Sequence, residues 1–197
     1  NKGKDYTTVK RILQELNERG IPALRLHVAI ITQEPSLQKA TASILINHLS
    51  SNKKEDVVEA IQGAYLMIQL TKSVISDATI RGVLEVFVEK VRWRHEVKLG
   101  SVLHFLSSII LEHRSFFRGE ILESLFLGLD YLADETTDIV SKSNGVLYVR
   151  LEAAAVAYEL YRLRRKWSER EKSILLKWER ICNSDSEFAE IRNQWKS

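Results

Sequence analysis

The sequence contains little cysteine, proline or glycine. Its 197 residues include 1 cysteine, 2 prolines and 8 glycines. The single thiol, Cys182, can form neither an internal disulfide nor a zinc cluster of cysteines, so both kinds of scaffold are excluded. So few prolines and glycines argue against a β architecture with many turns and against low-complexity disorder. The chain is long enough to bury a hydrophobic core of its own.

Long hydrophobic runs and an excess of one charge are also missing. The longest apolar stretch, 99–111, has 13 residues and includes His104, whereas a membrane-spanning helix needs about 20. The 29 Lys and Arg against 26 Asp and Glu leave a net charge of +3, which does not by itself indicate nucleic acid or membrane. We therefore expect a soluble, cytoplasmic protein without a membrane partner. The chain starts at Asn1, with neither an initiator methionine nor a signal-peptide pattern, and we expect it to be part of a longer protein.

Apolar residues recur with helical spacing along the whole chain. One example is the stripe of Ile80, Leu84, Phe87 and Val91, although the valines within 83–88 also favour a strand. Capping signals and glycines separate the periodic segments. The predicted helices are 6–19, 22–33, 35–50, 54–72, 77–92, 95–113, 117–133, 143–165, 169–182 and 185–196.

Three of these helices begin with a capping box, in which a polar residue precedes an acid by three positions. The pairs are Asn52 with Glu55, Ser168 with Glu171, and Ser184 with Glu187. Pro22 and Pro35 suit the first turn of a helix, where no backbone donor is needed. These signals predict an all-α protein whose helices are joined by short connections.

An internal repeat is visible in the glycine positions. Gly63 and Gly100 lie 37 residues apart, and so do the pairs Arg81-Gly82 and Arg118-Gly119. Two helices in a unit of that length are typical of helical-hairpin solenoids. The predicted helices 54–72 and 143–165 have apolar residues on two sides, which favours a stack of helices over a single compact ball.

The chain resembles the HEAT/armadillo-like class of α-solenoids in its paired helices 54–92 and 95–133, their Arg-Gly steps, and the closing segment 185–195 (DSEFAEIRNQW). The resemblance implies a right-handed stack of antiparallel helical hairpins with about ten helices, forming one domain over 1–197. It implies a binding platform and no catalytic residue. The final helix also resembles the helical C-terminal domains of large bacterial defence proteins, which adds antiviral defence to the expected roles.

Candidate catalytic and metal-binding residues lack their partner groups. His95, His104 and His113 share one predicted helix, but at about 100° per residue a spacing of nine places successive side chains on opposite sides. Ser101 and His104 are neighbours on that helix, yet no acid is placed to orient the histidine. The nucleophile-elbow, P-loop and dinucleotide-binding glycine motifs are absent. We expect no enzyme activity, no metal, no cofactor and no small-molecule substrate.

Charge is distributed unevenly along the second half of the chain. Segment 120–138 carries six acids and no Lys or Arg, whereas segment 162–180 has a net charge of +5. Trp178 shares a helical stripe with Ile174 and is expected to point inward, while Trp167 lies at a turn and is expected to be exposed. The two segments would allow head-to-tail contacts between copies of the chain.

We interpret the chain as a noncatalytic scaffold domain that binds a protein partner or associates with itself. The alternative is a nucleic-acid-binding platform, because basic residues with neighbouring aromatic rings can hold phosphates and stack on bases. Convergence of the basic residues on one face would favour that alternative. The candidate partner-binding residues are Arg81, Arg92, Trp93, Arg94, Arg118, Arg162, Arg164, Arg165, Lys166, Trp167 and Arg170.

Overall fold

The structure is a computed structural model that describes residues 35–70, 75–92, 98–134, 144–163 and 165–195, with isolated positions before residue 35. These residues form helices, turns and bends, and no strand occurs among them. The prediction of an all-α protein is therefore confirmed for the described part. The chain forms two compact units, Asn1–Leu84 and Glu85–Ser197. Whether 1–197 acts as one domain stays a prediction.

The first unit contains a short 3-10 helix, η1 (Pro35–Leu37), helices α3 (Gln38–Leu49) and α4 (Lys54–Leu70), and the first half of α5 (Asp77–Arg92). Pro35 opens η1 as its fixed backbone angle favours. A glycine brings Leu24 close to α4, because a Cβ at Gly63 would lie 2.9 Å from the Leu24 side chain. The backbone N–H of Leu24 also donates to Glu59 at 2.7 Å.

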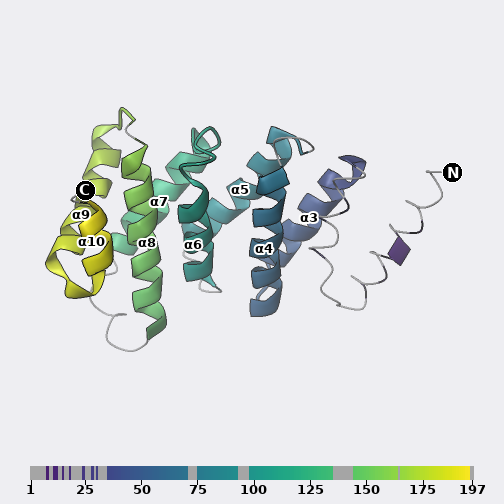
Figure 1. The fold of residues 1–197 in the computed structure, drawn as a ribbon, viewed down its shortest axis with the longest axis horizontal. Helices are drawn as coiled ribbons and strands as arrows, with labels where there is room; N and C mark the ends of the chain where they lie inside the picture. Colours follow the sequence, from purple (N-terminus) through teal and green to yellow (C-terminus); the bar gives the residue numbers. More distant parts are fainter. Residues whose placement is uncertain are drawn as a thin grey trace. The chain divides into compact units, whose positions relative to one another are not determined.

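The second unit contains the rest of α5, then α6 (Leu99–Ile109), α7 (Glu120–Asp134), α8 (Asn144–Arg162), α9 (Glu169–Ser184), the 3-10 helix η2 (Ser186–Phe188) and α10 (Ala189–Trp195) (Figure 1). The described ranges thus hold eight α-helices, where about ten were predicted. The predicted helices 6–19 and 22–33 lie largely outside the described residues, and the isolated positions described within them are helical. None of the helices found in the described ranges is both long enough and apolar enough to cross a membrane.

Contacts in the second unit join residues at a nearly constant separation. The His104 side chain of α6 meets Glu152 of α8, 48 positions later. Between α7 and α9 the separations are 47, for Asp130 with Lys177, and 49, for Leu129 with Trp178. Gly100 and Tyr148 are also 48 positions apart and in close contact, so two contacts share one separation and α6 is parallel to α8. The start of α7 and the start of α9 line the same cavity, with Glu123 and Leu127 on one side and Glu171 and Ile174 on the other, so α7 is parallel to α9.

The core of the second unit contains large side chains, among them Phe87 and Trp178, which the helical periodicity pointed inward. Trp178, Phe87, Phe117 and Phe188 are fully buried in the second unit. Segment 83–88 lies within α5, so its valines do not form a strand. Burial of an apolar stripe outweighs the weak strand preference of single residues.

Two of the predicted capping boxes are wrong by one residue. Ser168 and Glu171 form the predicted box at the start of α9. At α4 the hydroxyl of Ser51, rather than Asn52, accepts from the backbone of Lys53 and donates to Asp56. The last predicted cap also moves, because Ser184 is still the final residue of α9 and Asp185 caps η2 instead.

The predicted equivalence of the two Arg-Gly steps is also wrong. Gly82 lies inside α5, where a Cβ would meet nothing within 4 Å. Gly119 precedes α7 and has a φ of 57°, a left-handed conformation that glycine adopts without strain. The two glycines therefore serve different purposes, and their spacing of 37 does not mark the same place in two repeats. Helix α6 also ends at Ile109 rather than 113, because the chain turns through 110–118 before α7 starts.

Candidate functional site

The structure separates the predicted partner-binding residues into several groups. Trp93, Arg94 and Arg164 lie outside the described residues, and Arg81 belongs to the first unit. The others belong to the second unit: Arg92, Arg118, Arg162, Arg165, Lys166, Trp167 and Arg170. Only within this unit can their mutual arrangement be compared.

Arg92 and Arg162 bind acids of their own helices. Arg92 donates to the Glu89 carboxylate at 3.2 Å. Arg162 donates to both oxygens of Glu159, at 3.1 and 3.2 Å, and its guanidinium lies 5.6 Å from the centre of the Tyr158 ring. These contacts occupy both guanidinium groups with intramolecular partners.

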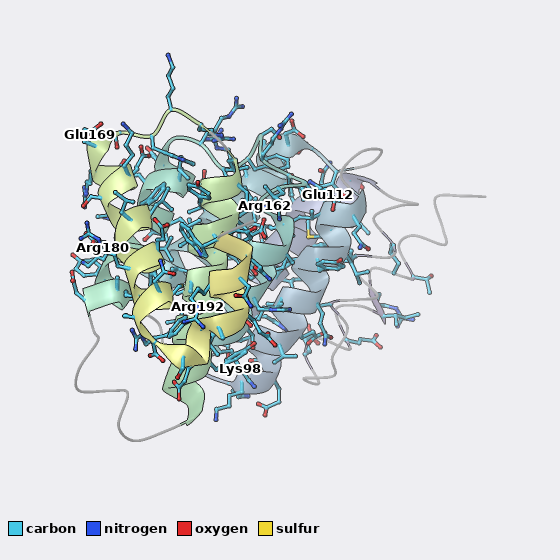
Figure 2. All side chains as sticks on the ribbon, turned by 60° about the vertical axis from the view of Figure 1, so that its left-hand side comes forward. Lys98, Glu112, Arg162, Glu169, Arg180 and Arg192 are labelled. Carbon is cyan, nitrogen blue, oxygen red and sulfur yellow. The ribbon has the colours of Figure 1, made fainter. Side chains whose placement is uncertain are left out.

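Arg165 joins two connections of the second unit. Its guanidinium donates to the backbone oxygens of Phe117 and Arg114, each at 2.5 Å. The connection between α8 and α9 is thereby held against the connection between α6 and α7. Both lie at the top of Figure 1. Figure 2 shows Glu112 and Glu169 toward this end and Lys98 toward the other.

Exposed cations lie on the joined connections and at the start of α9. We call Arg114, Arg118, Lys166 and Arg170 the basic rim; all are exposed, and none forms an ion pair with another described residue. The sequence analysis missed Arg114. Its position within HRSFFRG gives no sign that the segment lies against a connection about 50 residues later. The hydrogen bonds of Arg165 reveal that neighbourhood.

A pocket of about 380 Å³ opens beside the basic rim, between the first turns of α7 and α9. Apolar walls come from Leu122, Phe126, Leu127 and Ile174. The full lining is Gly119, Leu122, Glu123, Phe126, Leu127, Ser168, Arg170, Glu171 and Ile174. Its volume lies within the range of about 300–1,000 Å³ that is usual for binding pockets. Apolar walls and a charged margin suit a partly apolar ligand group.

Trp167 does not present an exposed ring, as the sequence analysis expected. The side chain is half-buried, and its ring makes a T-shaped contact with that of Phe126, with the ring centres 5.4 Å apart. Its buried Nε1 has no hydrogen-bond partner among the described residues. Trp178 is fully buried as expected, and its Nε1 donates to the backbone oxygen of Leu129 at 3.1 Å. Trp167 therefore packs against Phe126, a residue of the pocket wall.

The oppositely charged segments meet within the chain. Lys177 of α9 binds Asp130 of α7 at 3.2 Å and also pairs with Asp134. Burial alone lowers the pKa of Lys177, but hydrogen bonds and charges of the two aspartates outweigh burial and raise that pKa above its ordinary value. These charges are thus partly neutralised inside one copy, which weakens the expectation that they join separate copies.

An acid accompanies His104, contrary to the sequence-based expectation. Both oxygens of Glu152, at 3.1 and 3.2 Å, face the Nδ1 of His104. Ser101, however, hydrogen-bonds with Tyr148, whose pKa is raised by burial and by the nearby charge of Glu152. The serine hydroxyl is therefore directed to the phenol instead of to the histidine. No group of three or more His, Cys, Asp or Glu that could hold a metal occurs in the described ranges.

Cys182 is fully buried near the end of α9. Burial raises the pKa of its thiol to about 11, although the charge of Arg150 acts in the opposite direction. Arg150 is itself buried and lies 5.5 Å from the centre of the Phe188 ring. A thiol with such a pKa is almost entirely protonated at neutral pH and is a poor nucleophile.

No protein-family model, curated protein or solved structure matches this chain. The pocket and the basic rim are therefore identified as a candidate site from the contacts and charges of this chain alone.

Proposed function

We propose that this chain is a noncatalytic protein-interaction domain of the HEAT/armadillo-like type and that the α7–α9 pocket is its docking site. The observation that carries the proposal is the pocket itself, with apolar walls and a basic rim on two connections that Arg165 holds together. Protein interfaces typically combine an apolar centre with a polar margin.

The contacts of the second unit support the repeat architecture in this proposal. The nearly constant separation of 47 to 49 residues between α6 and α8 and between α7 and α9 is that expected when one helical hairpin follows another. Right-handed stacking of these hairpins is part of the proposal. Such stacks expose the ends of successive helices along one edge, where the pocket lies.

Several contacts favour a protein over the nucleic-acid alternative. Arg92, Arg162 and Arg165 are occupied by intramolecular acceptors, and the ring of Trp167 is half-buried and packs on Phe126. Glu123 and Glu171 line the pocket beside Arg170, where they would repel a continuous phosphate backbone. An apolar side chain is the better occupant of such a pocket.

A filled pocket tests the proposal. Leu127→Trp adds bulk to a half-buried pocket wall, and Leu151→Trp makes the same change at a half-buried position on α8 outside the pocket. Cross-linked partners captured in cells by the wild type and by Leu151→Trp should be lost from Leu127→Trp. Identical partners for all three proteins would overturn the proposed site.

Self-association is tested with the same variants. Sedimentation equilibrium over a range of concentrations would detect assembly of the wild type. If it assembles and Leu127→Trp alone stays monomeric, the protein partner is a second copy of the chain.

A further inference from the structure

We propose that the α7–α9 pocket receives one large apolar side chain from an acidic peptide segment of the partner. This inference rests on the proposed function and adds the chemistry of the ligand. It commits to a protein segment in which acids accompany an apolar anchor. Three features of the pocket support it. The apolar walls account for the anchor, the basic rim accounts for the acids, and Glu123 determines on which side the acids lie.

The anchor follows from the pocket walls. Leu122, Phe126, Leu127 and Ile174 surround the space, and Phe126 and Ile174 are themselves buried. A Leu, Met or Phe side chain that enters the pocket loses apolar surface to these walls, which is the main source of binding energy at such sites. The backbone of Gly119 and the side chain of Ser168 form the end nearest the connections. The hydroxyl of Ser168 already accepts a hydrogen bond from the backbone N–H of Glu171 in the cap of α9.

The acidic character follows from the basic rim. Arg170 lines the pocket, and Arg118 directly precedes Gly119, which also lines it. Lys166 and Arg114 extend the positive surface along the joined connections. Segments 113–119 and 165–168 contain no acid, and the exposed acids Glu112, Glu120 and Glu169 lie directly beyond them. Peptide carboxylates next to the anchor would therefore meet cations that have no ion-pair partner in the described part of the chain.

Glu123 gives the site a direction. It lines the pocket from α7 and is exposed, whereas Glu171 is held in the capping box of α9, where it accepts from Ser168 at 2.6 Å. An acidic peptide residue on the α7 side would be repelled by Glu123. The acids of the partner are thus expected on the side of the connections, and a neutral or basic residue on the side of α7.

Fluorescence anisotropy with labelled synthetic peptides tests this chemistry. The probes are a short peptide with a central Phe preceded by Asp and Glu, the same peptide with Ala for Phe, and versions with neutral or basic residues in place of the acids. Because a buried Phe contributes about 1.5–3 kcal/mol, its loss should weaken binding by about tenfold or more. Exchange of the acids for neutral residues should also weaken binding, and only the acidic peptide should lose affinity as salt rises.

Matched variants locate the binding surface. Arg170→Glu should lower the affinity for the acidic peptide by about tenfold, because one attractive contact becomes repulsive. Arg180→Glu makes the same change further along α9, away from the pocket (Figure 2), and should leave binding unchanged. Glu123→Gln should strengthen binding. Equal effects of Arg170→Glu and Arg180→Glu, or equal binding of the acidic and neutral peptides, would overturn the acidic ligand.

The outcomes separate this inference from the proposed function. If no acidic peptide binds but captured partners still depend on Leu127, the ligand chemistry is wrong and the docking site stands. If neither peptides nor captured partners depend on the pocket, both proposals are wrong. Duplex DNA or RNA that binds more tightly than any peptide, and loses affinity in Arg170→Glu alone, would establish the nucleic-acid alternative. Circular dichroism of each variant verifies that it is folded.

Discussion

Helix α7 meets its neighbours α5 and α9 in two different ways. On the α5 side, a Cβ at Gly128 would lie 2.7 Å from backbone atoms of Val91, so the two helices approach as closely as their backbones allow. On the α9 side, Trp178 and Lys177 bridge to α7 through Leu129 and Asp130. Large side chains make the contacts of that pair, and the pocket lies beside them, toward the start of both helices. The contact with α5 thus depends on the absence of a side chain at Gly128, whereas the contact with α9 is made by large side chains, and the pocket lies on that side of α7.

The largest effect is expected from Gly128→Ala. The added methyl group would collide with the Val91 backbone, which cannot move without displacing α5. Overpacking of this kind costs about 2–3 kcal/mol of unfolding free energy. Urea denaturation followed by far-ultraviolet circular dichroism would measure the loss. A variant as stable as the wild type would show that the close approach of α5 and α7 is not as described.

Trp178→Phe tests the other side of α7. It removes the buried hydrogen bond to Leu129 and leaves a small cavity, so we expect a loss of about 2 kcal/mol. Because the bond joins the two helices that line the pocket, binding at the pocket should weaken as well. Retention of full peptide affinity, measured at a temperature where the variant is folded, would show that Trp178 has no part in shaping the pocket.

Gly82→Ala makes the same chemical change as Gly128→Ala but in open space. Nothing lies within 4 Å of the added methyl group, and Gly82 is inside α5. Alanine is the better helix former by about 1 kcal/mol, so this variant should gain stability by up to that amount. We therefore expect the unfolding free energy to fall in Gly128→Ala and to rise in Gly82→Ala. Destabilisation by Gly82→Ala would indicate an unseen contact at that surface.

Lys177→Met should have the smallest effect. Its side chain is 35% exposed, and partly exposed ion pairs contribute less than about 1 kcal/mol. The pKa of Lys177 is raised in the folded chain, so its contribution is complete at neutral pH and disappears as pH rises through that pKa, above the ordinary lysine value of about 10.4. The stability difference between wild type and variant should therefore vanish at strongly alkaline pH and shrink in high salt. A stability difference that persists at strongly alkaline pH and in high salt would show that it does not come from the ion pairs of Lys177.

Local patterns in the sequence were sufficient to predict the helices. The stripe through Phe87 and Val91, the inward position of Trp178 and the capping box of Ser168 each depend on residues within one or two turns. Such signals are physical consequences of helical geometry and need no knowledge of the fold. They failed where neighbouring residues competed for the same task, as Ser51 and Asn52 do, and at the end of α6, where the chain turns from residue 110 onward.

The candidate site depends instead on separations that no local pattern contains. Arg165 reaches carbonyl groups 48 and 51 residues earlier, and Glu152 faces a histidine 48 residues earlier. The sequence identified Arg118, Lys166 and Arg170 as cations without indicating which of them lie beside a pocket. Trp167 was expected to be exposed because its partner Phe126 belongs to another helix. A prediction from one sequence cannot supply these neighbours.

The burial of Cys182 gives the molecule an internal reporter of its own opening. It is the single thiol of the chain, it is fully covered, and its pKa of about 11 keeps it protonated. An alkylating reagent can therefore modify it only during moments when the end of α9 separates from its neighbours. The labelling rate would measure how often that separation occurs. A bound partner that stabilises α9 would slow the labelling without touching the thiol.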